Sequence, residues 1–336
     1  MTELVATTPG LLPLPDWAKG ELSDLKGHQK SDLIDGTEGE AVTEAYDRVR
    51  AEELDWQTEA GLDRVVGGQA RWDDNIAHPL SMADAVDTRG IVRYYDNNNF
   101  YREPVVVGEL TATGDVAAEL DATAEALDDG AGDLQAVLPG PYSLADLATD
   151  EQYGDEAAFL DAVADFLVDE VEQFPDVATL FLLEPSLVEN PPEAGIDERA
   201  GAAIDRVATA TEADVVCHTY WGAVPEKPYA HLMDADLDAV GFDFVSDHEA
   251  NLYNITEYGT TDDIALGLVD GQNTRVEGVE TVRERVEWVG EQIPAQSFDT
   301  TYLTANTELF YLPVNRAREK LAVLARAAAG EEEVTA

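Results

Sequence analysis

Eight short apolar runs recur along the chain, and each ends abruptly in polar or turn-forming residues. The most distinctive run begins at Asp214 and ends in Cys217, His218, Tyr220 and Trp221. Buried parallel strands read as continuous apolar runs, and they carry reactive side chains at their carboxyl ends. We therefore expect eight strands, at residues 3–6, 62–66, 134–138, 178–183, 214–217, 239–243, 264–269 and 301–304.

Segments with helical character alternate with these runs. The expected helices span residues 40–60, 117–127, 156–174, 198–211, 276–293 and 313–329. Strands and helices that alternate at this spacing indicate an α/β fold with a parallel sheet under covering helices. Eight strands with polar ends predict a closed (β/α)8 TIM barrel whose site lies at the carboxyl face. An open, doubly wound sheet is the alternative.

One segment has a different pattern. Between residues 91 and 109, two arms rich in β-forming residues flank an Asp-Asn-Asn-Asn turn at residues 96–99, which indicates a β-hairpin. We place this hairpin outside the main sheet, as an insertion after the second strand. Residues 1–330 then form a single barrel domain, and the acidic tail 331–336 is expected to be disordered.

Composition limits the class of protein. With 336 residues and 45% hydrophobic content, the chain can bury a large core. No apolar run approaches the roughly 20 residues of a membrane helix, and the first residues lack a signal-peptide pattern. The single cysteine excludes an internal disulfide and fits a reducing compartment. We expect a cytoplasmic protein that does not bind membranes.

Charge is the strongest feature of the composition. The chain has 70 Asp and Glu against 20 Lys and Arg, a net charge of −50. Such self-repulsion opposes folding in dilute buffer, but at about 1 M salt the Debye length falls to roughly 3 Å. This balance predicts a halophilic protein. The acids are spread along the chain, which disfavours a dedicated surface for a basic partner. Nucleic acid is not an expected partner, because phosphate binding needs clustered Lys and Arg.

Seven segments follow in order along nearly the whole chain, at residues 7–13, 67–73, 101–108, 138–142, 184–187, 269–277 and 312–321. Together they resemble the catalytic domain of cobalamin-independent methionine synthase. The resemblance implies a barrel of the uroporphyrinogen decarboxylase type, a bound zinc, and methyl transfer from a methyl-folate or related pterin to the thiol of homocysteine. It also implies site residues: Asp270 and Glu184 for catalysis, and Thr8, Gly10, Arg71, Asp73, Tyr142, Glu184 and Trp221 for substrate binding.

The zinc ligands of this family are only partly matched. His218 stands at the histidine of the family's His-x-Cys pair, but Tyr220 replaces the cysteine. Asp243 is the counterpart of a glutamate ligand, so His218 and Asp243 are the metal candidates. The last loop offers Asn306, Thr307 and Glu308 in place of a thiol. Cys217 cannot substitute, because neighbouring strand residues point to opposite faces. A hydrogen-bonded histidine inside the barrel is the alternative for His218.

Three functions follow as hypotheses. The first is a methyltransferase of methionine biosynthesis, which holds zinc with oxygen donors or works with a paralogous, zinc-competent subunit. The second is an accessory or pterin-binding paralogue without independent activity. The third is decarboxylation of a porphyrinogen, which is disfavoured because no basic cluster near the amino terminus would receive a polyanionic substrate.

Overall fold

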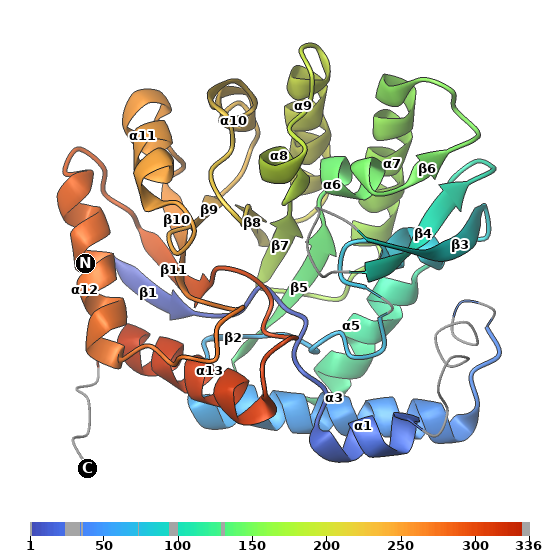
Figure 1. The fold of residues 1–336 in the computed structure, drawn as a ribbon, viewed down its shortest axis with the longest axis horizontal. Helices are drawn as coiled ribbons and strands as arrows, with labels where there is room; N and C mark the ends of the chain where they lie inside the picture. Colours follow the sequence, from blue (N-terminus) through green and yellow to red (C-terminus); the bar gives the residue numbers. More distant parts are fainter. Residues whose placement is uncertain are drawn as a thin grey trace.

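The computed structural model describes residues 2–23, 34, 36–72, 74–93, 100–128 and 132–330. Eight parallel strands form one sheet in the order β1-β11-β10-β9-β8-β7-β5-β2, with the long helices around it (Figure 1). The strands are β1 (Glu3–Ala6), β2 (Arg64–Val65), β5 (Asp133–Pro139), β7 (Thr179–Leu183), β8 (Asp214–His218), β9 (Ala239–Asp243), β10 (Asp263–Val269) and β11 (Thr300–Ala305). All eight predicted strands are therefore confirmed.

The sheet is a nearly closed barrel. The backbone N–H of Asp63, just before β2, donates to the carbonyl of Ala6 at 3.1 Å, and the Ala6 N–H donates to the Asp63 carboxylate at 2.8 Å. These bonds join the first and last strands of the order. The (β/α)8 prediction is confirmed, and the open doubly wound sheet is wrong.

Strand β2 has only two residues, although five were expected. The Gln57 side chain explains the loss, because it takes both backbone groups of Val66: its amide donates to the Val66 carbonyl at 2.8 Å and accepts from the Val66 N–H at 2.9 Å. Gly68 follows with a φ of 74°, which ends extended backbone.

Twelve helices are named along the described chain. They are α1 (Asp16–Ser23), α3 (Glu40–Ala60), α4 (His78–Ser81), α5 (Asp115–Ala126), α6 (Pro141–Asp146), α7 (Glu156–Val171), α8 (Ser186–Glu189), α9 (Ile196–Ala208), α10 (Glu226–Leu232), α11 (His248–Tyr258), α12 (Val279–Gln292) and α13 (Val314–Ala328). All six predicted helices are present, with ends within three residues of the expected ones. No described helix is long and apolar enough to cross a membrane.

The core has two main parts. One cluster fills the barrel interior and includes Val5, Val137, Phe181, Val216, Tyr220 and Tyr302. A larger cluster lies between the strands and the helices and includes Cys217. Inward and outward positions therefore alternate along β8, and the Cys217 side chain points away from His218 and Tyr220.

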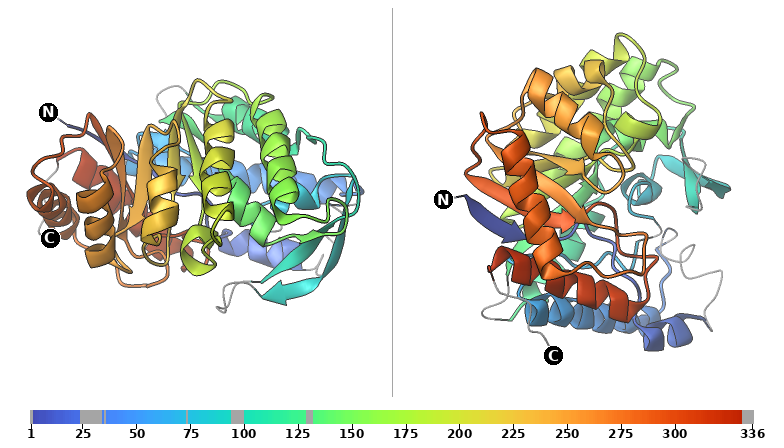
Figure 2. Two further views of the ribbon diagram at one scale, coloured as in Figure 1. Left: turned by 90° about the horizontal axis from the view of Figure 1, so that it is seen from above. Right: turned by 60° about the vertical axis from the view of Figure 1, so that its left-hand side comes forward.

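A second, smaller sheet lies beside the barrel. Strands β3 (Val86–Arg93) and β4 (Phe100–Val106) pair antiparallel, and β6 (Thr149–Asp150) joins β4. Figure 2 shows this sheet projecting from the side of the molecule. The pair lies where the hairpin was expected, although β3 begins at Val86 instead of residue 91. The expected turn at residues 96–99 and the tail 331–336 lie outside the described residues.

Candidate active site at the carboxyl end of the barrel

Glu184 follows β7 and is fully buried. Its carboxylate accepts hydrogen bonds from the backbone N–H groups of Tyr142 at 3.0 Å and Ser143 at 2.8 Å, and from the Ser143 hydroxyl at 2.6 Å. Burial raises the pKa of Glu184 to about 7, although these hydrogen bonds act in the opposite direction. Glu184 thus joins β7 to the start of α6, and its carboxyl group can exchange a proton near neutral pH.

Asp243 ends β9 and links three strand ends. Its carboxylate accepts from the backbone N–H groups of Trp221 at 2.9 Å, Val245 at 2.9 Å and Ser246 at 2.8 Å. The Asn306 side-chain amide after β11 lies 3.1 Å from both carboxylate oxygens. These contacts hold the Trp221 backbone at a φ of 72°, a left-handed conformation that few non-glycine residues adopt.

His218 is also tied to Asn306. Its Nε2 lies 2.9 Å from the Asn306 carbonyl, and because a carbonyl can only accept, Nε2 carries the hydrogen. Burial lowers the pKa of His218, although the Asn306 carbonyl and the Asp243 charge act in the opposite direction, so the ring is neutral. Its Nδ1 is buried without a hydrogen-bond partner among the described residues and lies where a side chain at Gly241 would be.

The residues present do not fit a zinc site. A zinc ion in a protein needs at least three well-placed ligands. Among the described residues, the Asp243 carboxylate and His218 Nε2 are engaged in internal hydrogen bonds, which leaves His218 Nδ1 as the one unpartnered donor atom of the pair, and Cys217 points out of the barrel. Across the described ranges, no three His, Cys, Asp or Glu side chains are grouped to hold a metal ion. The expected metal pair His218 and Asp243 is instead part of a hydrogen-bonded link through Asn306.

The remaining expected residues follow other strands of the barrel. Asp270 follows β10 and accepts from the Gln272 N–H at 2.9 Å. The Thr8 hydroxyl after β1 is buried and has no hydrogen-bond partner within the described part of the chain. Gly10 has a φ of 88°, and a side chain there would collide with Gln69. The Tyr142 hydroxyl donates to the Asn190 carbonyl at 2.6 Å.

The Arg71 guanidinium makes ion pairs with three acidic side chains. It is within 3.0 Å of Glu38, 3.0 Å of Asp115 and 3.1 Å of Glu119. The expected role of Arg71 in substrate binding would therefore require it to leave one of these ion pairs. Asp73 lies outside the described residues.

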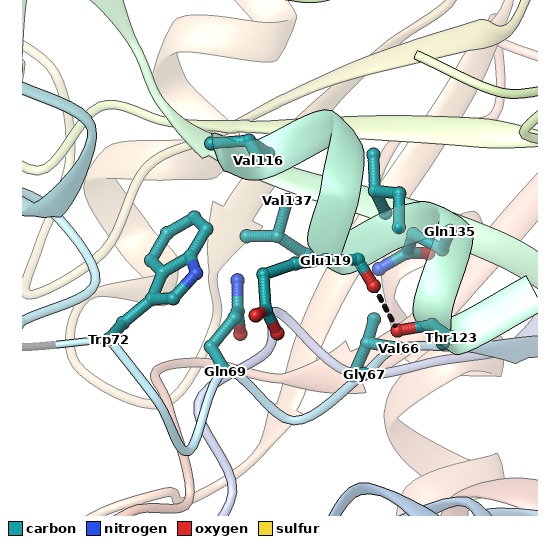
Figure 3. Close-up of a pocket in the computed structure, with 10 residues that line it drawn as sticks. Val66, Gly67, Gln69, Trp72, Val116, Glu119, Thr123, Gln135 and Val137 are labelled. Atoms are coloured by element: carbon teal, nitrogen blue, oxygen red, sulfur yellow. Dashed lines mark hydrogen bonds between the residues drawn. The ribbon is translucent and has the colours of Figure 1, made fainter. Parts of the chain in front are cut away.

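The sequence analysis missed Gln69, whose side chain accepts from the Leu11 N–H at 2.6 Å and so joins the loops after β1 and β2. It named Asn306 only as a residue of the last loop, and not as the link between His218 and Asp243. Figure 3 shows Gln69 beside Glu119, with Trp72 at one end, around a cavity of about 30 Å³ between β2, β5 and α5. This volume suits one or two water molecules and is too small for a substrate.

Relatives with solved structures share the fold. A B12-independent methionine synthase from Shewanella sp. W3-18-1, in complex with selenomethionine, superposes with a TM-score of 0.78 at 18% identity, covering 97% of this chain and 96% of that one. A putative vitamin-B12 independent methionine synthase from Listeria monocytogenes gives a TM-score of 0.73 at 16% identity, with 98% of both chains covered.

Sequence relatives point to the same family. A methionine synthase of Saccharolobus islandicus (strain Y.N.15.51) is 21% identical over 293 residues, which cover 86% of this chain and 83% of the relative. The family model described as cobalamin-independent synthase, N-terminal domain, matches residues 82–294, whereas the strand-end segments resembled the catalytic domain. Since this match spans more than half of the chain, the protein belongs to the cobalamin-independent methionine synthase family.

Proposed function

We propose that this chain takes part in methyl transfer from a methyl-folate or related reduced pterin to the thiol of homocysteine, together with a paralogous, zinc-competent chain. Membership of the cobalamin-independent methionine synthase family supports methyl transfer to homocysteine as the reaction. A relative from Bacillus cereus (strain AH187), 25% identical over 109 residues that cover 32% of this chain and 14% of the relative, is named 5-methyltetrahydropteroyltriglutamate–homocysteine methyltransferase. The composition supports work in the cytoplasm at high salt.

The link from His218 through Asn306 to Asp243 carries the proposal of a second chain. The thiolate is the nucleophilic form of homocysteine, and a free thiol has a pKa of about 8.5. The family activates its thiol on zinc, but Asp243 is hydrogen-bonded to Asn306 and no third ligand is grouped with it and His218 among the described residues. Activation of the thiol is therefore assigned to the partner chain.

The contribution of this chain is the binding of substrate at the carboxyl end of the barrel. Asp270 lies at the edge of this end, and Glu184 has a pKa of about 7, which suits proton exchange at neutral pH. Trp221 and Tyr142 offer aromatic faces for a planar pterin, with Thr8 and Gly10 in the neighbouring loop. An accessory paralogue that binds pterin without any activity of its own is the second candidate, and the same hydrogen-bonded link favours it.

Metal analysis and a mixing experiment test the proposal. Methionine formation is measured for this chain, for a paralogue that carries both zinc cysteines, and for their mixture. We expect substoichiometric zinc and weak transfer for this chain alone, and a clear gain on mixing. Unchanged partner activity would contradict the two-chain proposal.

A His218→Ala variant provides the control for the metal. If His218 does not bind zinc, the variant keeps the same metal content as the parent chain. The opposite result would be one tightly held zinc per chain that is lost in His218→Ala, together with full homocysteine methylation by the isolated protein. It would show that this barrel holds zinc through His218 and contradict the proposal.

A further inference from the structure

Two neighbouring cavities lie between α11 and α12, outside the barrel interior. The first has a volume of about 330 Å³ and is lined by Phe244, Val245, His248, Leu268, Arg285, Trp288 and Val289. The second has about 170 Å³ and is lined by Val245, Asp270, Asn273, Arg275, Glu277, Gly278, Thr281 and Arg285. They share Val245 and Arg285, so together they form one groove, the α11–α12 groove.

Within the described ranges, the two arginines of this groove lack acidic partners. Neither Arg275 nor Arg285 has a carboxylate within ion-pair distance among the described residues, in a chain that has 70 acidic side chains. Glu277 lines the same cavity, but its carboxylate is taken by the Lys320 ammonium at 2.7 Å and the Asp270 N–H at 3.0 Å. The Arg285 guanidinium donates a hydrogen bond from Nη1 to the Leu268 carbonyl.

A guanidinium has five N–H donors in a planar fork that matches a carboxylate. The Arg275 guanidinium has no hydrogen-bond acceptor in the described part of the chain, and the Arg285 guanidinium has only the Leu268 carbonyl. Both arginines line the 170 Å³ cavity, and Arg275 is exposed to solvent. The cavity also meets the start of α12, where the N-cap residue Gly278 provides no side-chain acceptor, so the positive end of the helix dipole adds to the two charges.

The larger cavity is apolar and aromatic. Trp288 is 37% exposed, and its ring meets the His248 ring edge to face at 5.4 Å between centroids. Phe244, Leu268 and Val289 form the buried wall. A planar apolar group can pack against such a wall with one face on the tryptophan.

We propose that the α11–α12 groove binds a small aromatic carboxylate. The carboxylate pairs with Arg275 and Arg285 in the smaller cavity, and the ring occupies the larger one beside Trp288. Asp270 lies at the edge of the smaller cavity and repels a second negative charge, which favours a monoanion over a phosphate dianion. The groove shares Asp270 with the proposed methyl-transfer site, but its occupancy is measured by binding alone, so the test does not depend on the methyl-transfer proposal.

Calorimetric titration with benzoate tests this site, at the lowest salt that preserves the far-UV circular dichroism of the fold. Benzamide is the neutral probe of the same shape, and acetate is the anion without a ring. We expect saturable binding of benzoate and at least tenfold weaker binding of the other two. Equal binding of benzoate and benzamide, or no heat from benzoate, would overturn the proposal.

Single substitutions locate the site. Arg275→Gln and Arg285→Gln should each weaken benzoate binding at least tenfold. Arg283→Gln is the matched control, because Arg283 lies on α12 and lines neither cavity, yet its loss changes the net charge equally. Equal weakening by Arg283→Gln would mean that only long-range charge attracts the anion. If Arg285→Gln does not fold, the exposed Arg275 decides the outcome.

Discussion

Replacing Glu53 by glutamine should stabilise the protein at neutral pH. Glu53 lies on α3, is fully buried, and has no hydrogen-bond partner on either carboxyl oxygen within the described ranges. Its side chain fills the space beside Gly68, where any Cβ would collide with it. Burial raises the pKa of Glu53 well above its usual range and the Glu52 charge raises it further, while Arg50 acts in the opposite direction. Burial therefore favours the protonated form of this carboxyl in the folded protein.

The magnitude follows from the cost of that protonation. An unfolded glutamate has a pKa of about 4.3, and each pH unit corresponds to about 1.36 kcal/mol, so the upper bound of the cost, for a carboxyl that stays fully protonated at pH 7, is about 3.7 kcal/mol. Because the folded pKa is raised, the contribution of Glu53 is complete below the unfolded pKa and is lost as pH rises through the folded pKa. Glutamine keeps the shape and does not titrate.

The assay is denaturant unfolding of parent and variant between pH 4 and pH 8, at constant high salt. The gain from Glu53→Gln should be absent near pH 4 and should grow by about 1.36 kcal/mol per pH unit above the unfolded pKa. Glu44→Gln is the matched control, because Glu44 is exposed on the same helix and its loss changes the net charge equally. A difference that is independent of pH, or is matched by Glu44→Gln, would refute the reasoning.

Three further outcomes are expected. Stability should fall below about 0.1 M salt, where the Debye length reaches about 10 Å, and an unfolding series that does not change with salt would contradict this. The Cys217 thiol, buried with its pKa raised well above the usual range by burial and then by Glu184, should react with a thiol reagent only at the rate of unfolding. Gly241→Ala should cost about 1–3 kcal/mol by overpacking against His218, whereas Gly290→Ala, in open space on α12, should not destabilise. Denaturant midpoints of both variants check this pair, and equal midpoints would argue against the close packing at Gly241.

The barrel was predictable because its strands and long helices carry strong local patterns. Helix α3 agrees with its prediction at both ends. The short helices were not predicted, because tertiary contacts with residues far away in the sequence determine them. Helix α6 has six residues, begins with Pro141, and has its first N–H groups bound by Glu184, which lies more than 40 residues later in the chain.

For the site, the sequence predicted only which residues lie at the ends of the strands. Whether such a residue is available for a ligand depends on partners far away in sequence. Asn306 lies 88 residues from His218 and 63 residues from Asp243, and no local pattern relates the three. Arg71 likewise meets its carboxylates only after α5 packs beside α3.

The buried charge of Asp243 explains how this end of the barrel can be stable without a metal. A buried carboxylate is costly unless it is neutralised or fully hydrogen-bonded. Here three backbone N–H groups and the Asn306 amide surround both oxygens, and the Asn306 carbonyl holds the neutral His218 ring. A cation bound by Asp243 would have to displace the Asn306 amide from both carboxylate oxygens. The same contacts that stabilise the strand ends therefore oppose metal binding by Asp243.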